Sequence, residues 1–209
     1  MDPGTVAVVG LCAFLILWYA VAHVYNRHHG RQLFRWLERG LPVLGSEWDA
    51  GWIGSSASGA RVNITRARTP FRRLEITLLL ARREVPLLWL FDHLRGRRDR
   101  LIIKATLRSP RRGEVEVGLF RRMDPLRRDP SWAWEEGPHR LAIAYREAGA
   151  PQQVAGLRPW LECYGAHVGR FSWQKRDPHV QLQMNIPSSA EAVMADLRRA
   201  VGEATHVNK

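Results

Sequence analysis

The chain begins with a long, uncharged apolar segment. Residues 5–25 contain no Asp, Glu, Lys or Arg, and a helix of that length, rising about 1.5 Å per residue, spans roughly the 30 Å of a bilayer hydrocarbon core. The segment therefore predicts a single transmembrane helix. A cleaved signal peptide is the alternative, because residues 20–22 (AVA) resemble a cleavage site. The retained anchor is favoured because the four preceding residues, MDPG, have no basic side chain.

Basic residues follow this segment and define the expected membrane topology. Only Asp2 is charged before it, whereas residues 27–39 contain four arginines. The positive-inside rule then places residues 1–4 outside the cell membrane and residues 41–209 in the cytoplasm. Residues 26–40 predict a basic amphipathic helix, ended by Gly40 and Pro42, which either lies on lipid or continues the span and packs on the domain. The side chains expected at the membrane interface are Trp18, Tyr19, Tyr25, Arg27, Arg31, Phe34, Arg35 and Trp36.

From about residue 60 the apolar positions recur with a period of two. Leu74, Ile76 and Leu78, for example, alternate with Glu75 and Thr77. Such alternation is typical of strands buried on one face, which favours antiparallel pairing over a doubly wound parallel sheet. About seven strands are expected, near residues 60–65, 74–80, 101–108, 114–119, 141–145, 171–173 and 180–186.

Three segments predict helices that cover the apolar face of these strands. They are residues 86–94, 151–164 and 189–203. The first has Pro at its start and Gly96 beyond its end, and the third opens with the capping-box spacing SSAE. The fold class is therefore α+β. Residues 121–138, rich in Pro and Arg, predict either a functional loop or a boundary between two halves of the domain.

The charge balance favours anionic partners. Lys and Arg total 32 against 20 for Asp and Glu, a formal charge of +12. Arginines gather in three expected turns, and because hairpins bring alternate turns to one edge of a sheet, these turns predict a basic rim. Two tryptophans in the third turn would be exposed apolar anchors. The predicted partner- and anion-binding residues are Arg97, Arg98, Arg111, Arg112, Arg121, Arg122, Arg127, Arg128, Trp132 and Trp134.

No residue pattern identifies a catalytic, metal or cofactor site. The phosphate-loop, dinucleotide, nucleophile-elbow and zinc-protease motifs are absent from the sequence. Cys163 and His167 have a spacing that suits two metal ligands, but no further Cys or His pair completes a tetrahedral site. No cofactor or metal is therefore expected. The candidates for proton transfer are Glu135, Glu136 and His139.

These patterns favour a non-enzymatic, membrane-anchored protein, such as an accessory subunit of a membrane complex. Its basic domain would bind a partner protein or the anionic membrane surface. One alternative is an enzyme that acts on a lipid-linked or anionic substrate at the cytoplasmic face. A nucleic-acid binder is a weaker alternative, because the polar strand faces offer few aromatic rings for bases to stack on.

Overall fold

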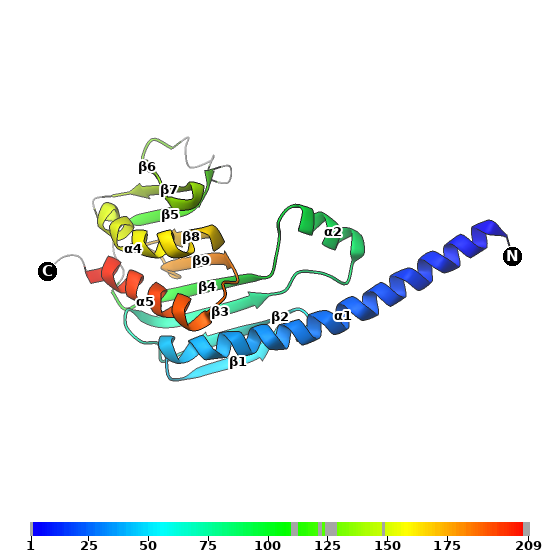
Figure 1. Ribbon diagram of the computed structural model, residues 1–209. Helices are drawn as coiled ribbons and strands as arrows, with labels where there is room; N and C mark the ends of the chain where they lie inside the picture. The colour runs from blue at the N-terminus through cyan, green and yellow to red at the C-terminus, as the bar shows by residue number, and fades with distance from the viewer. Residues whose placement is uncertain (1, 110–112, 121–122, 124–128, 148, 207–209) are drawn as a thin grey trace.

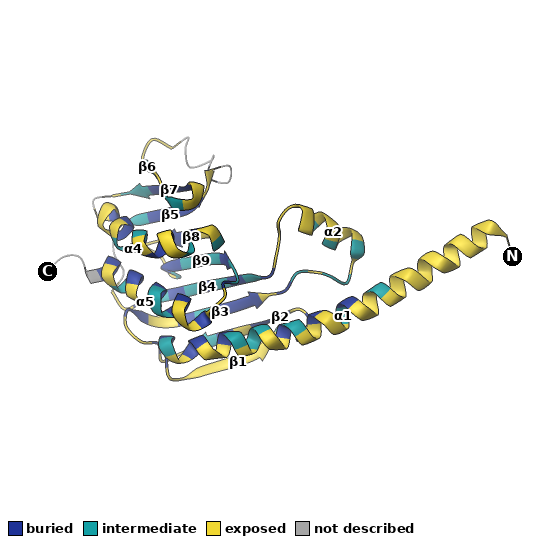
Figure 2. Ribbon diagram, viewed as in Figure 1, coloured by how far each residue is buried: buried dark blue, intermediate teal, exposed yellow. Residues whose placement is uncertain are grey.

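The computed structural model describes residues 2–109, 113–120, 123, 129–147 and 149–206. The chain begins with α1 (Pro3–Leu44), one uninterrupted helix whose first half projects away from the rest of the molecule (Figure 1). Among the described residues, α1 alone is long and apolar enough to cross a membrane. Figure 2 shows that the first half is almost entirely exposed, whereas the second half carries buried and intermediate residues among exposed ones.

The second half of α1 packs on the domain, which corresponds to one of the two alternatives for residues 26–40. Leu37, Leu41 and Leu44 are fully buried. The helix continues past Gly40 and Pro42, the residues expected to end it, and its end at Leu44 is followed by an extended Gly45. Burial of the three leucines outweighs the weak helix preference of the two residues, since tertiary packing commonly overrides propensity.

Nine antiparallel strands form one sheet, in the order β1-β2-β3-β4-β9-β8-β5-β7-β6. The strands are β1 (Trp48–Trp52), β2 (Gly59–Ile64), β3 (Phe71–Leu79), β4 (Arg100–Leu107), β5 (Glu114–Leu119), β6 (Ala133–Glu136), β7 (Leu141–Arg146), β8 (Val168–Trp173) and β9 (Val180–Asn185). The seven expected strands are all present. The two additional strands, β1 and β6, are the edge strands of the sheet.

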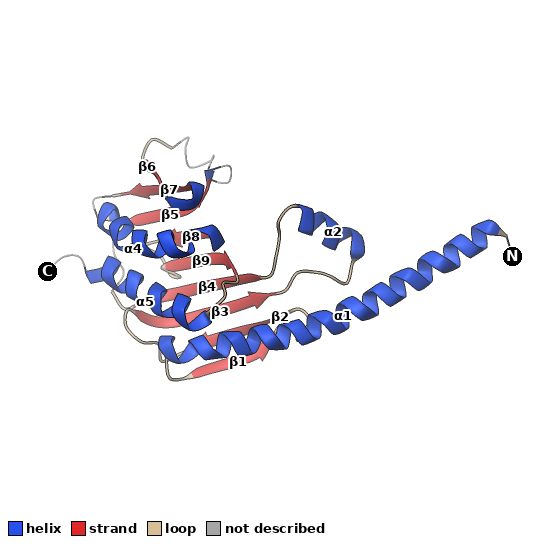
Figure 3. Cartoon of the chain, viewed as in Figure 1, coloured by secondary structure: helices blue, strands red, loops and turns tan. Residues whose placement is uncertain are grey.

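Within the described residues, helices cover one face of this sheet only (Figure 3). They are the second half of α1, α4 (Ala150–Tyr164) and α5 (Ala190–His206), with α5 packed against both of the others. Short 3₁₀ turns, η2 (Pro138–Arg140) and η3 (Gly165–His167), precede β7 and β8. The core between the layers contains residues such as Leu101, Ile103 and Leu182, all at most 1% exposed. The opposite face of the sheet carries the polar members of the alternation.

The expectation that residues 86–94 cover the sheet is wrong. They do form a helix, α2 (Pro86–Leu94), but it lies beyond the end of the sheet, beside the projecting part of α1, and has no buried residue (Figures 1 and 2). The apolar sequence of α2 resembles that of a core helix. The core is nevertheless filled by α1, α4 and α5.

Candidate functional site

The connection between β3 and β4, residues 80–99, forms an arm that carries α2 out along α1. Large apolar side chains on α2 are open to solvent: Leu87 is 79% exposed, Leu94 is 76% exposed, and Phe91 is 51% exposed. Exposed apolar residues scattered singly need no explanation, whereas a contiguous group indicates an interaction surface. The arm is therefore the first candidate site.

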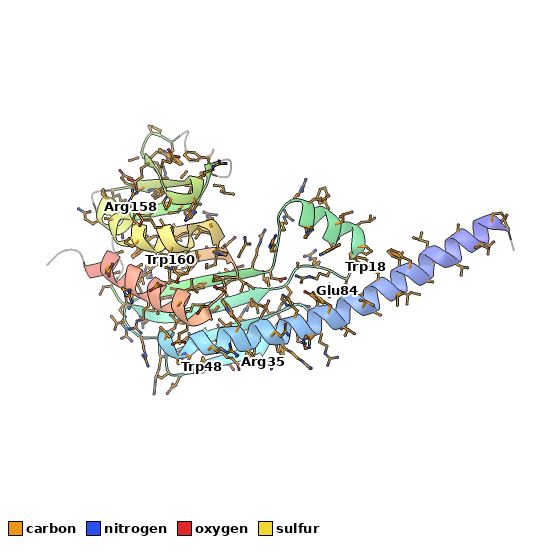
Figure 4. All side chains as sticks on the ribbon, in the orientation of Figure 1. Trp18, Arg35, Trp48, Glu84, Arg158 and Trp160 are labelled. Carbon is orange, nitrogen blue, oxygen red and sulfur yellow. The ribbon has the colours of Figure 1, made fainter. Side chains whose placement is uncertain are left out.

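Contacts with α1 hold the arm in place. The indole Nε1 of Trp18 donates a hydrogen bond to the carbonyl oxygen of Arg83 over 2.9 Å, and the ring of Trp18 lies 5.7 Å from the ring of Trp89 on α2. The buried Asn26 donates from Nδ2 to the carbonyl oxygen of Ala81 over 3.1 Å and to the carboxylate of Glu84 over 3.0 Å. Figure 4 shows Trp18 and Glu84 at this junction.

Asp99, at the base of the arm, joins the arm to α1. Its Oδ1 accepts a hydrogen bond from the backbone N–H of Ala81 over 2.7 Å, and its two oxygens accept from Nη1 and Nη2 of Arg83 over 3.0 and 2.9 Å. The ring Nε2 of His29 lies 2.9 Å from Oδ2. Burial alone raises the pKa of Asp99, but the hydrogen bonds from Arg83 and Ala81 outweigh it and lower the pKa below its ordinary value.

The residues expected at the membrane interface divide into three groups: those that contact the arm, those that contact the domain and those that remain exposed. Trp18 joins the arm, and the guanidinium of Arg83 lies 5.3 Å from the ring centre of Tyr25, while Tyr19 remains 56% exposed. Phe34 and Trp36 instead contact the domain: Phe34 packs on Trp52, and Trp36 donates to the carbonyl oxygen of Ser188. The remaining members of the set, all exposed, are Arg27, Arg31 and Arg35.

A groove on the helix-free face of the sheet is the second candidate site. Its volume is about 960 Å³, and its floor includes Gly118 and Gly169, whose missing side chains leave a hollow in the sheet surface. Four basic side chains and two carboxylates line it, and three of the basic ones form ion pairs: Arg146 with Glu114, Arg170 with Glu116, and Lys175 with Glu147 beside the groove. These charged residues are Arg146, Arg170, Lys175 and Arg176, with Glu114 and Glu116.

Hydrogen bonds organise the centre of the groove. Glu116, only 7% exposed, accepts from Nε of Arg170 over 3.1 Å and from the hydroxyl of Ser172. Gln174 donates in turn to the Ser172 hydroxyl oxygen over 3.0 Å. Strand register explains the cluster, because Glu116 of β5 lies directly opposite Ser172 of β8. Opposed residues on one face of an antiparallel pair are close enough to interact.

An aromatic wall closes one side of the groove. Trp132 lines it, and the guanidinium of Arg146 lies 4.8 Å from the centre of the Trp132 ring. Trp132 and Trp134, expected to be exposed anchors, are half-buried against Met123, Ala142 and Ala144. Trp132 therefore forms an edge of the groove, and the two rings do not project freely as an aromatic pair.

The predicted basic rim is described only in part. Arg97 and Arg98 are exposed after α2, and Arg97 forms an ion pair with Asp92 over 2.9 Å. Arg108 and Gly113, which flank the second turn, lie at the end of the sheet opposite to that of Arg97. The other rim residues lie outside the described residues: Arg111, Arg112, Arg121, Arg122, Arg127 and Arg128.

The candidates for proton transfer do not converge on the groove. Glu135 forms an ion pair with Arg158 of α4 over 2.5 Å, and Nε2 of His139 lies 2.9 Å from the carbonyl oxygen of Glu162. Glu136 follows Glu135 in β6, where successive side chains point to opposite faces. Within the described part of the chain, no group of three or more His, Cys, Asp or Glu side chains could hold a metal ion.

Sequence reasoning missed the central residues of both sites. Asp99 stands in the run RGRRDR, where it looks like one charge in a solvated turn. Glu116, Arg170 and Ser172 occupy polar positions of alternating strands, a pattern that predicts solvent exposure. Only the pairing of β5 with β8, which joins segments more than 50 residues apart in sequence, brings these three together.

The comparisons with known proteins add no family. No protein-family model matches this sequence, and no curated protein is significantly similar to it.

Proposed function

We propose that this chain is a non-enzymatic, single-pass protein of the cell membrane whose cytoplasmic domain binds a partner protein. Its N-terminus lies outside, α1 crosses the bilayer, and the groove on the sheet receives an acidic segment of the partner. The observation that carries this proposal is the excess of basic side chains around the 960 Å³ groove.

The shape and chemistry of the groove support a polypeptide ligand. Its volume is at the upper end of the range for small-molecule sites, roughly 300–1,000 Å³. Lys175 and Arg176 project from the β8–β9 hairpin and are exposed, so they can steer an acidic segment toward the groove.

The enzyme alternative has less support. Glu135 and His139 are engaged by Arg158 and by a backbone carbonyl, and neither side chain lines the groove. A general base must be within hydrogen-bond reach of the proton that it removes. We assign the anionic membrane surface, the other predicted partner of the domain, to the arm and not to the groove.

The test compares two double charge reversals in the full-length protein, purified from its own membranes in mild detergent. The groove variant is Lys175→Glu with Arg176→Glu. The control is Arg66→Glu with Arg72→Glu, which alters the same charge at exposed positions outside the groove. Lys175 and Arg66 are matched, because each forms an exposed ion pair with one glutamate, Glu147 and Glu47 respectively.

We expect the wild type and the control to retain a stoichiometric polypeptide, identified by mass spectrometry, that the groove variant loses. Equal retention by all three proteins would remove the groove as the binding surface. Recovery of lipid alone with the wild type would contradict the whole proposal. A nucleic acid lost steeply with rising salt would do so as well, and would favour the third alternative.

A further inference from the structure

The side chains of α2 lack the division into apolar and polar faces expected for a helix on a protein surface. From Pro86 to Phe91 the sequence is PLLWLF, apolar on every side, and a histidine and an aspartate come only near the end. A helix that is apolar all round is buried either in a large core or in a membrane. Because no residue of α2 is buried within this chain, another medium must cover it.

The position of α2 along α1 indicates which medium this is. Residues of α1 before Ala22 are almost all exposed, and burial begins at Ala22 and at Asn26, which contacts the arm. Trp18, which contacts Trp89 of α2, lies about 6 Å before Ala22 at 1.5 Å per residue. If the exposed apolar half of α1 occupies a bilayer, α2 lies just inside its cytoplasmic boundary, within the roughly 5–10 Å at which interfacial helices insert.

Charges at both ends of α2 fit this depth. Arg82 and Arg83 precede the helix and Arg95, Arg97 and Arg98 follow it. The guanidinium of Arg95 lies 3.8 Å from the centre of the Phe91 ring, so an apolar side chain supports it. Arginines in such places reach back to the phosphate level while their stems remain in apolar surroundings.

We propose that α2 inserts into the cytoplasmic leaflet as a second membrane contact, lying in lipid beside the span formed by α1. The helix has 9 residues, about 14 Å at 1.5 Å per residue, and is too short to cross the bilayer. Lipid is the occupant that matches apolar exposure on every side that α1 leaves open, since a protein partner would cover only one of those sides. The lipid that surrounds the first half of α1 also reaches α2 without a further component.

This inference rests on the membrane-spanning role of α1 in the proposed function, but it does not depend on the groove. The proposed insertion also gives the hydrogen bonds of Trp18, Asn26 and Asp99 a structural role. They hold the arm at a constant height along α1. An apolar helix that was free to turn back onto the domain would compete with α1, α4 and α5 for the core. The contacts with α1 oppose that alternative.

The experiment places one fluorescent probe at a time in the purified full-length protein, reconstituted in vesicles of phosphatidylcholine and phosphatidylglycerol. Cys163→Ser leaves Cys12 as the single thiol, within the proposed span. Three further proteins combine Cys12→Ala and Cys163→Ser with Leu87→Cys, Leu94→Cys or Thr65→Cys. An environment-sensitive label on each thiol is quenched by lipids that carry a nitroxide at a shallow or a deep acyl position.

We expect the labels at positions 87 and 94 to emit at shorter wavelength than in water and to be quenched more by the shallow than by the deep nitroxide. The label at Cys12 should favour the deep nitroxide. The label at position 65, which is exposed at the end of the sheet away from α2, should show neither effect.

Water-like, unquenched emission at positions 87 and 94 with normal quenching at Cys12 would overturn the insertion of α2 and leave the span intact. It would point to a protein that covers α2 and is absent from the vesicles. Absence of quenching at Cys12 as well would overturn the span and, with it, both proposals. Loss of partner binding in the groove test leaves these signals unchanged, so the two failures are distinguishable.

Discussion

At the scale of single residues, Asp99 is the side chain on which the position of the arm depends. Its side chain is 12% exposed and that of Arg83 is 20% exposed, so the pair is well screened from water. Buried ion pairs are not strongly stabilising against an apolar replacement, but removing one partner leaves the other charge uncompensated. Asp99 is therefore expected to tolerate substitution poorly.

The variant Asp99→Asn tests this expectation. The amide keeps one oxygen for the N–H of Ala81, but its NH₂ group then takes the place of Oδ2 and faces Nη2 of Arg83, where a donor meets a donor. We expect unfolding in urea to show a loss of about 3 kcal/mol in the free energy of unfolding. Asp49→Asn, at an exposed position of the edge strand β1, is the control and should be neutral. Equal stability of the two variants would show that the pair does not hold the arm.

Acid should act through the same carboxyl group. The pKa of Asp99 is lowered in the folded protein from its ordinary value of 3.8, so the folded state binds the proton less tightly than the unfolded chain does. The stabilisation from this group is complete above pH 3.8 and is lost as the pH falls through the lower, folded pKa. In acid titrations of stability, Asp99→Asn should flatten the decline over that window. If the free energy of unfolding of Asp99→Asn falls at low pH as steeply as that of the wild type, Asp99 does not contribute to the acid sensitivity.

At the scale of elements, close packing of α1 on the domain requires a residue without a side chain at position 30. A Cβ atom built on Gly30 would lie 1.9 Å from the carbonyl oxygen of Ser56, a backbone atom that cannot turn away. Gly10, in the projecting half of the same helix, would meet nothing within 4 Å. Substitution of Gly30 therefore tests the packing of α1 on the domain, whereas substitution of Gly10 tests helix propensity alone.

We expect Gly30→Ala to lower the free energy of unfolding of the domain by about 1–3 kcal/mol. Alanine improves helix propensity by about 1 kcal/mol. The steric overlap with Ser56 costs more than this gain, because relieving it requires a shift of either α1 or the turn around Ser56. Gly10→Ala gains the same propensity without the overlap. Thermal unfolding in detergent should separate the variants, and a Gly30→Ala protein as stable as Gly10→Ala would show that α1 does not pack so closely.

The elements of the core could be predicted from the sequence because each follows one periodicity. The seven alternating strands and the helices ending at Tyr164 and His206 were expected, with small differences in their bounds. Strand β1 was missed because all five of its residues are exposed and show no alternation. Strand β6 was missed because it has four residues in a segment rich in Pro and Arg.

The role of α2 and the groove could not be predicted for a different reason. Periodicity and end signals predicted the existence of α2, but apolar sequence alone does not distinguish burial in a core from exposure to lipid. The groove depends on pairing between distant strands and on Gly118 and Gly169 sharing one region of the sheet. The pairing of distant strands is set by the topology of the sheet and cannot be predicted from the sequence of any single segment.

At the scale of the whole molecule, chemical labelling of the two cysteines tests the proposed membrane topology. Both Cys12 and Cys163 are free and exposed in this chain. A charged maleimide that cannot cross membranes should label Cys163 in inside-out vesicles but not in intact cells. It should leave Cys12 unmodified in both, because Cys12 lies within the proposed span. Labelling of Cys163 from outside the cell would reverse the predicted orientation.

The unbroken course of α1 has a mechanical consequence. From residue 23 to residue 44 the helix extends about 33 Å past its exposed half, at 1.5 Å per residue, with no hinge between span and core. In a bilayer this length is a lever arm: a change of ~10° in tilt, within the roughly 0–40° found for membrane helices, displaces its far end by about 6 Å. Because tilt responds to bilayer thickness, the proposed span would make the height and angle of the groove above the membrane depend on the thickness of the surrounding lipid.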